Sequence, residues 1–240
     1  LIKKLFENKS KIIAYENIFK YFCEFLGTFA LVFFASGAII IDAKIGNLGS
    51  IGPGIISGAI VTIVIYTFMN ISGAHVNPAL SLSLAIIGKF QKKLLLGYIF
   101  FQLLGSLLAS IILYYLIGNE GKMGANLPNF EIGISPLTAV IIEFIITLIL
   151  AIVICETTND KSNFYPFCGI IIGITVGIGV MLFGPIAGGC MNPARAFGPH
   201  LLSGDFKYYW IYILGPSLGM IAGCYIYRIS HSLLNVEKKE

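Results

Sequence analysis

The sequence contains the triplet Asn-Pro-Ala twice, and each copy stands where a helix could begin. The first copy is Asn77-Pro78-Ala79 and the second is Asn192-Pro193-Ala194. Asparagine is a preferred N-cap residue, and proline suits the first helical position because its missing N–H would have no partner there. Two such helix starts would point their positive dipole ends at one place and could offer asparagine N–H groups to a passing oxygen. This chemistry suits the passage of neutral hydrogen-bonding molecules and opposes cations.

Charged residues are scarce. The 240 residues are 57% hydrophobic and 12% charged, whereas about 25% of the residues of a soluble domain are charged. The longest charge-free stretches are residues 45–88 and 162–194. Because a bilayer-spanning helix needs about 20 predominantly apolar residues, the composition excludes an ordinary soluble enzyme. It predicts an all-α membrane protein that crosses the bilayer several times.

The apolar segments predict six transmembrane helices. They cover residues 21–41, 52–69, 94–117, 137–156, 166–183 and 208–228. Each long charge-free stretch continues beyond its span, through one of the triplets, into a further apolar piece. Each piece could form a helix of about 15 Å, half the thickness of a ~30 Å hydrocarbon core. We therefore expect two re-entrant half-helices, whose irregular ends must face protein or a water-filled cavity.

The two halves of the chain resemble each other in the order of their motifs. Glu24-Phe25 opens the first span and Glu143-Phe144 opens the fourth, each ahead of one triplet. Three spans per half is an odd number, so the second half must be inverted relative to the first. Inverted repeats with interrupted helices mark solute pathways near the membrane midplane. We expect one channel domain at residues 21–230, with halves 21–118 and 137–230.

The distribution of positive charge predicts the orientation. Of the 16 lysines and arginines, four fall on the side opposite to the chain ends: Lys44, Lys122, Arg195 and Lys207. Cytoplasmic loops are enriched in lysine and arginine. Both termini are therefore expected in the cytoplasm, as a segment at residues 1–20 and a tail at residues 231–240. The expected location is the plasma (cytoplasmic) membrane.

Three charged residues lie within or beside the apolar core. Glu24 and Glu143 would be costly in a membrane without partners, so we expect them to accept hydrogen bonds from the backbone of the re-entrant loops. Arg195 would be the third residue of the second half-helix, where the dipole opposes a positive charge. An arginine at an apolar pore mouth would donate to solute oxygens and repel cations and protons. The alternative is an arginine on a surface loop.

These motifs resemble those of the aquaporins, the major intrinsic protein family, over nearly the whole chain. The resemblance rests on Glu24-Phe25-Leu26-Gly27-Thr28, on the segment from Ser72 to Ala79 and on the segment from Asn192 to Pro199. It implies a passive channel without cofactor or metal, embedded in lipid as a homotetramer with one pore per subunit. In that family, the residues that match Glu24 and Glu143 brace the re-entrant loops. The residue that matches Arg195 belongs to an aromatic/arginine constriction.

Alignment outward from each triplet gives the other constriction positions as Ser57, Val180 and Gly189. Water-selective members typically carry an aromatic residue and a histidine at the first two positions, and glycerol facilitators carry aspartate where this chain has Ala196. The small constriction, together with Tyr212-Ile213, is most similar to nodulin-26-like plant channels. This similarity implies a broad channel for glycerol, urea and undissociated boric and arsenous acids, which also passes water. Glycine at position 189 lets a backbone carbonyl approach the path closely.

Other functions stay open at this stage. The main alternative is a predominantly water-selective aquaporin. A coupled secondary transporter could also use an inverted repeat, but ion-coordinating carboxylates near the midplane would have to come from Glu24 and Glu143. An intramembrane enzyme is least expected, since the sequence shows no nucleophile–base pair and no metal cluster, and its five cysteines are scattered without a zinc-binding spacing. We expect no nucleic-acid partner.

Overall fold

In the part of the chain that the structure describes, six long and two short helices form a bundle. The computed structural model describes the backbone of residues 2–49 and 51–237, and the side chains of residues 15–49 and 51–232. The long helices are α1 (Ile2–Ile45), α2 (Gly52–Ser72), α4 (Leu95–Leu116), α5 (Pro136–Thr157), α6 (Cys168–Ala187) and α8 (Tyr209–Glu237). The short helices are α3 (Pro78–Ile86) and α7 (Pro193–Ser203). Short 3-10 turns cover Lys92–Leu94, Glu120–Gly124, Phe130–Ile132, Tyr165–Phe167 and Phe206–Tyr208, and the described residues contain no strand.

The predicted all-α membrane fold is confirmed. Among the described residues, six helices are long and apolar enough to cross a membrane, and the two short helices begin at the two proline residues of the triplets. The first and last helices are longer than the apolar pattern suggested: α1 begins at Ile2, and α8 continues to Glu237. No glycine or proline precedes Gly27, so nothing in the early sequence stops the helix from extending beyond its apolar part.

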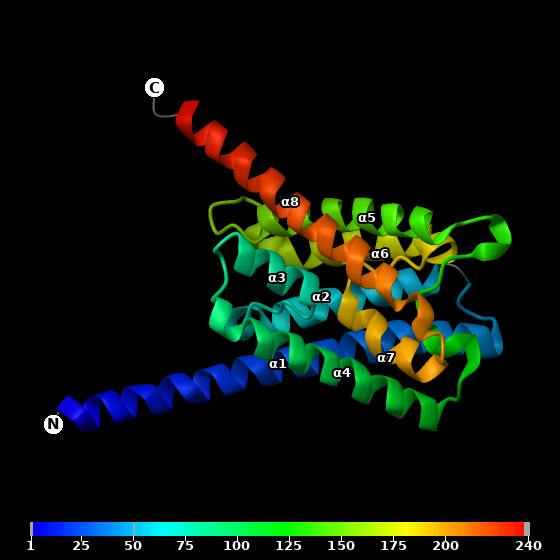
Figure 1. The fold of residues 1–240 in the computed structure, drawn as a ribbon, viewed down its shortest axis with the longest axis horizontal. Coiled ribbons are helices and arrows are strands. Elements are labelled where there is room, and N and C mark those ends of the chain that lie inside the picture. Colours follow the sequence, from blue (N-terminus) through cyan, green and yellow to red (C-terminus); the bar gives the residue numbers. More distant parts are fainter. Residues whose placement is uncertain (1, 50, 238–240) are drawn as a thin grey trace.

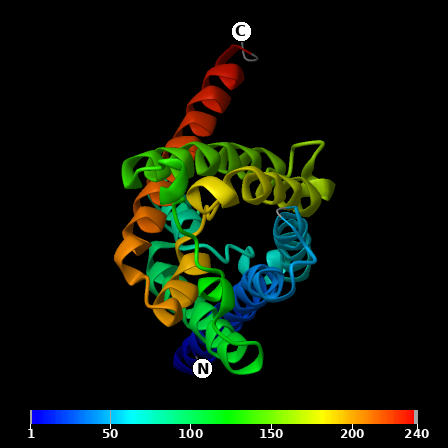
Figure 2. The same ribbon diagram turned by 90° about the vertical axis from the view of Figure 1, so that its right-hand side faces the viewer.

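The two halves have equivalent packing. In the first half α1 packs against α2 and α4, and in the second half α5 packs against α6 and α8. The halves meet chiefly where α2 lies against α6. The described ends of α1 and α8 project from the same end of the bundle (Figure 1), and the long helices form a ring around the two re-entrant segments (Figure 2).

Each short helix packs against the last long helix of the other half. α3 lies against α8, and α7 lies against α4. This exchange interlocks the halves, so neither half closes its own core without the other. It also brings the N-terminal ends of the two short helices, with their asparagine caps, to the interior of the ring.

Glycine residues let α2 and α6 approach closely. A β-carbon on Gly173 would lie 2.5 Å from the carbonyl oxygen of Gly58, and a β-carbon on Gly58 would lie 2.6 Å from that of Gly173. Neither position has room for a side chain, because backbone occupies the space. Small residues have this role in membrane helix packing, where close contact replaces the hydrophobic driving force.

Replacement of Gly173 by alanine is expected to destabilise the protein. The added methyl group must push α2 and α6 apart, and overpacking of this kind costs about 1–3 kcal/mol. The loss of stability would be measured as a lower thermal unfolding midpoint of the detergent-solubilised variant. Gly184→Ala, on the same helix, is the control, since a β-carbon there meets only Val180 at 3.8 Å. Equal midpoints for the two variants would contradict the proposed packing.

Candidate functional site at the half-helix junction

Asn77 and Asn192 cap the two short helices in the same way. Asn77 precedes α3 with φ −153° and ψ 116°, and Asn192 precedes α7 with φ −154° and ψ 111°. The Oδ1 atom of Asn77 accepts a hydrogen bond from the Ala79 N–H at 2.9 Å, and that of Asn192 accepts from the Ala194 N–H at 2.9 Å. The side-chain oxygens thus satisfy N–H groups at the helix starts that have no intrahelical partner. The two triplets adopt one local structure.

Each asparagine also reaches the opposite half of the chain. The Nδ2 atom of Asn77 donates to the carbonyl oxygen of Met191 at 2.9 Å, and that of Asn192 donates to the carbonyl oxygen of Val76 at 2.8 Å. Each acceptor immediately precedes the other asparagine. We call these reciprocal bonds the asparagine junction. The sequence led us to expect these amide groups to offer N–H donors to a passing oxygen. One of the two N–H groups on each side chain is engaged by the other half, and one is left for another acceptor.

The two acceptor residues of the junction have an unusual backbone conformation. Val76 has a φ of 42° and Met191 has a φ of 56°. Both lie in the left-handed region, which residues other than glycine seldom occupy and β-branched residues such as valine occupy least often. Such strain persists where the surrounding structure over-determines it. The Val76 N–H donates to Glu24 Oε2 at 2.6 Å, and the Met191 N–H donates to Glu143 Oε2 at 2.8 Å. Both backbone groups of each strained residue are therefore hydrogen-bonded.

Glu24 on α1 and Glu143 on α5 are fully buried. The other oxygen of each carboxylate also accepts a hydrogen bond from the backbone of a re-entrant segment. Glu24 Oε1 accepts from the His75 N–H at 2.9 Å, and Glu143 Oε1 accepts from the Cys190 N–H at 2.7 Å. A buried carboxylate needs several such bonds to offset the loss of water. Each carboxylate thus ties one long helix to the segment that carries its asparagine.

The first half contains further contacts that the sequence analysis missed. Gln102 on α4 donates from Nε2 to Glu24 Oε2 at 2.7 Å and to Ser81 Oγ at 3.1 Å. The Tyr98 hydroxyl donates to the carbonyl oxygen of Ser72 at 2.7 Å. The available signal was an amide side chain within an otherwise apolar span. These bonds fix both the carboxylate and the end of α2 from which the re-entrant segment departs.

A cavity passes the asparagine junction. Its polar lining residues include Ser57, His75, Asn77, Thr158, Asn192 and Arg195. Its apolar lining residues include Leu31, Val61, Ile65, Leu80, Leu150, Ile154, Ile172, Val176 and Val180. A mostly apolar wall with a few placed polar groups fixes where a polar ligand can bind. We call the two ends of this cavity the Thr158 end and the Arg195 end.

The four predicted constriction residues line this one cavity. Ser57 comes from α2, Val180 from α6, Gly189 from the segment before α7 and Arg195 from α7 itself. Gly189 has a φ of 58°, and a β-carbon there would lie 2.8 Å from the Gly184 nitrogen. Backbone conformation and packing therefore both require glycine at position 189. The role of these four residues in selectivity stays a prediction.

The guanidinium of Arg195 is held by the segment between α4 and α5. Nη1 donates to the carbonyl oxygen of Gly124 at 2.7 Å and to the Oδ1 atom of Asn126. Asn126 in turn donates from Nδ2 to the carbonyl oxygen of Gly188 at 2.7 Å. Arg195 is 5% exposed, so it is not a surface-loop arginine. Asn126 lies in an irregular segment without a motif, which gave the sequence analysis no signal for it.

Two ion pairs fasten the segment that holds Arg195. Lys122 Nζ lies 2.9 Å from Asp205 Oδ2, and Lys44 Nζ lies 3.3 Å from Glu120 Oε1. The backbone N–H of Glu120 and the Lys44 side chain lower the pKa of the Glu120 carboxyl. All four residues at 121–124 have φ values between 50° and 66°. Exposed ion pairs contribute little individually, but these two tie this left-handed turn to two different parts of the bundle.

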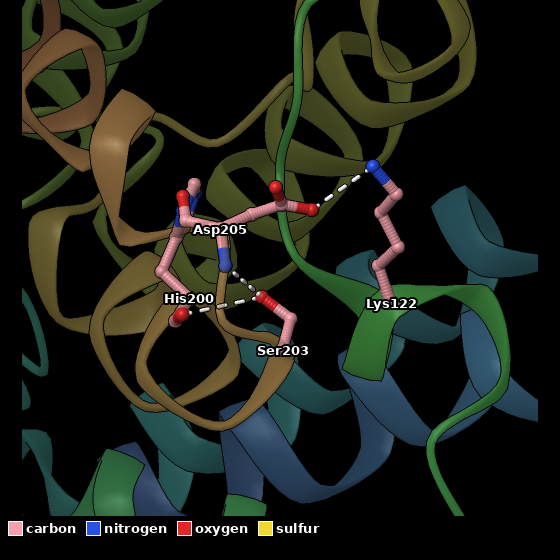
Figure 3. Close-up of polar contacts among 4 residues, drawn as sticks. All are labelled: Lys122, His200, Ser203 and Asp205. Atoms are coloured by element: carbon pink, nitrogen blue, oxygen red, sulfur yellow. Dashed lines mark hydrogen bonds and ion pairs between the residues drawn. The ribbon is translucent and has the colours of Figure 1, made fainter.

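The turn after α7 positions Asp205 for its ion pair (Figure 3). The Asp205 N–H donates to Ser203 Oγ at 3.2 Å, and the Ser203 hydroxyl donates to the carbonyl oxygen of His200 at 3.2 Å. The carboxylate then points away from this turn toward Lys122 (Figure 3). The end of α7 and the segment that holds Arg195 are thereby joined.

Replacement of Glu143 by glutamine is expected to lower the stability of the second re-entrant segment. The glutamine NH₂ group would face one of the two N–H groups that donate to the carboxylate, so one hydrogen bond would be lost. Loss of a hydrogen bond to a charged group costs about 1.5–3 kcal/mol. The thermal midpoint of the detergent-solubilised protein should fall. Glu131→Gln, the same change at an exposed position, should leave it unchanged. A midpoint of Glu143→Gln equal to that of the control would refute the bracing role.

Comparison with known proteins places the chain among membrane channels. A profile of the major intrinsic protein family matches residues 11–227. Nodulin-26 from Glycine max is 34% identical over 225 residues, which cover 93% of this chain and 82% of the relative. Aquaporin NIP1-1 from Arabidopsis thaliana is 35% identical over 214 residues, which cover 87% of this chain and 72% of that relative. The X-ray structure of the aquaglyceroporin from Plasmodium falciparum matches with a TM-score of 0.79 and 27% identity, over 88% of this chain and 95% of that one.

The family profile spans most of the chain, and relatives more than 30% identical cover most of its length. The structural match extends to nearly all of the aquaglyceroporin chain. The protein therefore belongs to the major intrinsic protein family.

Proposed function

We propose that this protein is a passive transmembrane channel for small uncharged solutes and water that excludes ions and protons. The observation that carries the proposal is the asparagine junction, which lies on a cavity with mostly apolar walls. The relatives are named as aquaporins, and the similar solved structure is named as an aquaglyceroporin. The family consists of membrane channels, in keeping with the expectation that the chain is not an enzyme.

The junction supplies hydrogen bonds where a solute has lost most of its water. Asn77 and Asn192 each keep one N–H group to which no described residue offers an acceptor, and a permeating hydroxyl, carbonyl or water oxygen accepts hydrogen bonds from these groups in turn. The positive dipole ends of α3 and α7 meet at the same place and repel cations. Because the walls nearby are apolar, an ion would find few groups there to replace its hydration shell.

The constriction supports a broad solute range. Ser57, Val180 and Gly189 are small or medium-sized, and they share the cavity with the fixed guanidinium of Arg195. A polyhydroxylated solute or urea can accept hydrogen bonds from the arginine and pass without meeting an aromatic ring. We therefore propose glycerol, urea and undissociated boric and arsenous acids as solutes. A predominantly water-selective channel is the alternative.

A coupled transporter fits the contacts less well. The two carboxylates beside the re-entrant segments, Glu24 and Glu143, are both engaged by backbone N–H groups. Such carboxylates have few lone pairs left to bind a coupling ion. Their symmetric use in the two halves also suits a bracing role, which we propose for both.

We propose a homotetramer in the plasma (cytoplasmic) membrane with both termini in the cytoplasm. Large apolar side chains on the outer surface of α5 support burial against lipid or a neighbouring subunit: Ile141, Ile145 and Ile149 are each about half exposed. The lysine and arginine distribution supports the orientation. Residues 21–230 would form the channel domain, with halves at 21–118 and 137–230, between the segments at 1–20 and 231–240.

Replacement of Ser57 by phenylalanine is expected to block larger solutes before water. The ring would fill part of the Arg195 end of the cavity, and a barrier raised by about 1.4 kcal/mol reduces flux about tenfold. Proteoliposome swelling with glycerol, urea and boric acid, and osmotic water flux in parallel, would measure the change. Ile63→Phe, at a 59% exposed position on the same helix, is the matched control.

Unchanged glycerol and boric acid flux in Ser57→Phe would contradict the proposed constriction. Fast water flux without any solute flux in the wild type would instead favour the water-selective alternative. The corresponding test at Gly189 is less informative, because a side chain there collides with backbone and would disturb the fold as well as the path.

The glycerol flux of Asn126 variants should depend on how many of the hydrogen bonds of Asn126 each variant keeps. Asn126→Asp keeps an acceptor for Arg195 but loses the donor to Gly188, whereas Asn126→Ala loses both. Loss of the Asn126 acceptor leaves the guanidinium with only the carbonyl oxygen of Gly124, so we expect it to turn into the Arg195 end of the cavity and obstruct it. Glycerol flux should therefore fall in the order wild type, Asn126→Asp, Asn126→Ala. Asn129→Ala, at a partly buried position in the same segment whose side chain bonds to Pro185 and Glu131 instead of Arg195, serves as the control. Wild-type flux in Asn126→Ala would show that Asn126 does not position Arg195.

A further inference from the structure

Two cysteines on different helices face each other away from the asparagine junction. The thiol of Cys155 on α5 donates to the Sγ atom of Cys224 on α8, and the two sulfur atoms are 3.6 Å apart. Cys224 is fully buried, whereas Cys155 is partly exposed. None of the bonds that form the junction or hold Arg195 involves either thiol. The pair therefore has no part in the proposed permeation mechanism.

The backbone of α5 and α8 fixes the thiols near each other. Gly219 and Gly223 on α8 pack directly against carbonyl oxygens of α5, and a β-carbon on Gly223 would lie 2.5 Å from the carbonyl oxygen of Leu148. Cys224 follows the second of these glycines, so it lies where the two helices are in close contact. Two ligands that the fold already holds together bind a common atom with little further loss of conformational freedom.

The distance between the two sulfur atoms indicates the bond angle at an atom that both could bind. Bonds of about 2.3 Å to a central atom place two sulfurs about 3.8 Å apart at a tetrahedral angle and about 4.6 Å apart when the three atoms are collinear. A disulfide requires about 2.05 Å. The observed 3.6 Å therefore suits a bent dithiolate chelate with only small changes in side-chain rotamers.

The surroundings restrict what that central atom can be. Among the described residues, no group of three or more His, Cys, Asp or Glu side chains could hold a metal ion. A tetrahedral metal ion would need two ligands in addition to the two thiolates. A three-coordinate pyramidal atom that already carries one organic substituent needs only the two sulfur atoms. We propose that Cys155 and Cys224 form a binding site for trivalent arsenicals. This site does not depend on which solute the pore carries.

The binding reaction is a condensation without oxidation or reduction. Two As–OH bonds of an organoarsonous acid break as the two Cys S–H bonds break, two As–S bonds form, and two water molecules leave. Arsenic stays trivalent and keeps its organic substituent. The product joins α5 to α8 through a single arsenic atom.

The site has a route of access at the Thr158 end of the cavity. Ile154, next to Cys155 on α5, and Thr158, which caps the end of α5, line that cavity. Cys155 is not itself a lining residue, but it is partly exposed. We expect a small arsenical to reach this partly exposed thiol from the Thr158 end without unfolding of the bundle. The second bond then closes within the structure.

Phenylarsine oxide, which hydrates to phenylarsonous acid, is the probe that tests this site. Full-length protein in detergent micelles is treated with it, washed with a monothiol and measured by intact-protein mass spectrometry. We expect one phenylarsenic group that the monothiol does not remove and that an excess of a dithiol does. Cys155→Ser and Cys224→Ser should each reduce the retained adduct at least about tenfold, since one As–S bond exchanges readily with free thiol. Cys23→Ser and Cys168→Ser should retain it.

Peptide mapping of the treated wild-type protein provides a test that does not depend on the folding of any variant. It should find arsenic bridging the peptides that contain Cys155 and Cys224. An absence of retained adduct on the folded wild type would overturn the proposal. Retention at wild-type level in Cys155→Ser or Cys224→Ser, or a bridge between other cysteines, would overturn it equally.

Discussion

The interaction on which the structure depends is the reciprocal hydrogen bonding between each asparagine and the carbonyl group that precedes the other. Asn77 donates to Met191 and Asn192 donates to Val76. These two bonds hold the starts of α3 and α7 against each other in the interior of a helical ring. The left-handed backbone of the two acceptor residues turns their carbonyl groups toward the partner, and the buried carboxylates of Glu24 and Glu143 hold the same residues by their N–H groups.

The inverted repeat explains why this arrangement occurs twice. Each short helix packs on the last long helix of the other half, so the halves can only close together. The glycine contacts between α2 and α6 and between α5 and α8 bring backbones close enough to keep the ring narrow. The second half carries in addition Arg195, which has no counterpart in the first half and is fixed by Asn126 and Gly124. The symmetry of the scaffold is thus broken at the Arg195 end of the cavity.

Much of the fold follows from local sequence features. The charge-free stretches and the two triplets predicted six spans and two half-helices, because hydrophobic length and helix capping are properties of adjacent residues. Helix α1 extends beyond the predicted span of residues 21–41 because the residues before position 21 favour helix as strongly as the apolar residues after it. A pattern of hydrophobicity marks the part of a helix that lies in the membrane, but it does not mark where the helix itself begins.

The contacts of the site were harder to predict. Asn126 meets Arg195 across 69 positions of sequence, and no motif marks the irregular segment in which it lies. Gln102 could be recognised as a polar residue in a span, but its hydrogen bond to Glu24 could not be predicted. The use of one amide N–H of each asparagine for the opposite half also depends on how the halves meet. These features arise from tertiary packing, which a local pattern does not contain.

The central claim is that a neutral solute crosses the asparagine junction by passive diffusion while ions and protons are excluded. The most direct measurement follows glycerol uptake and internal pH together in proteoliposomes, with and without an imposed membrane potential and a sodium or proton gradient. The account predicts glycerol flux that is linear in concentration and unaffected by either gradient, without a protein-dependent change in internal pH. Saturable uptake that collapses with the ion gradient, or proton entry driven by the potential, would contradict it.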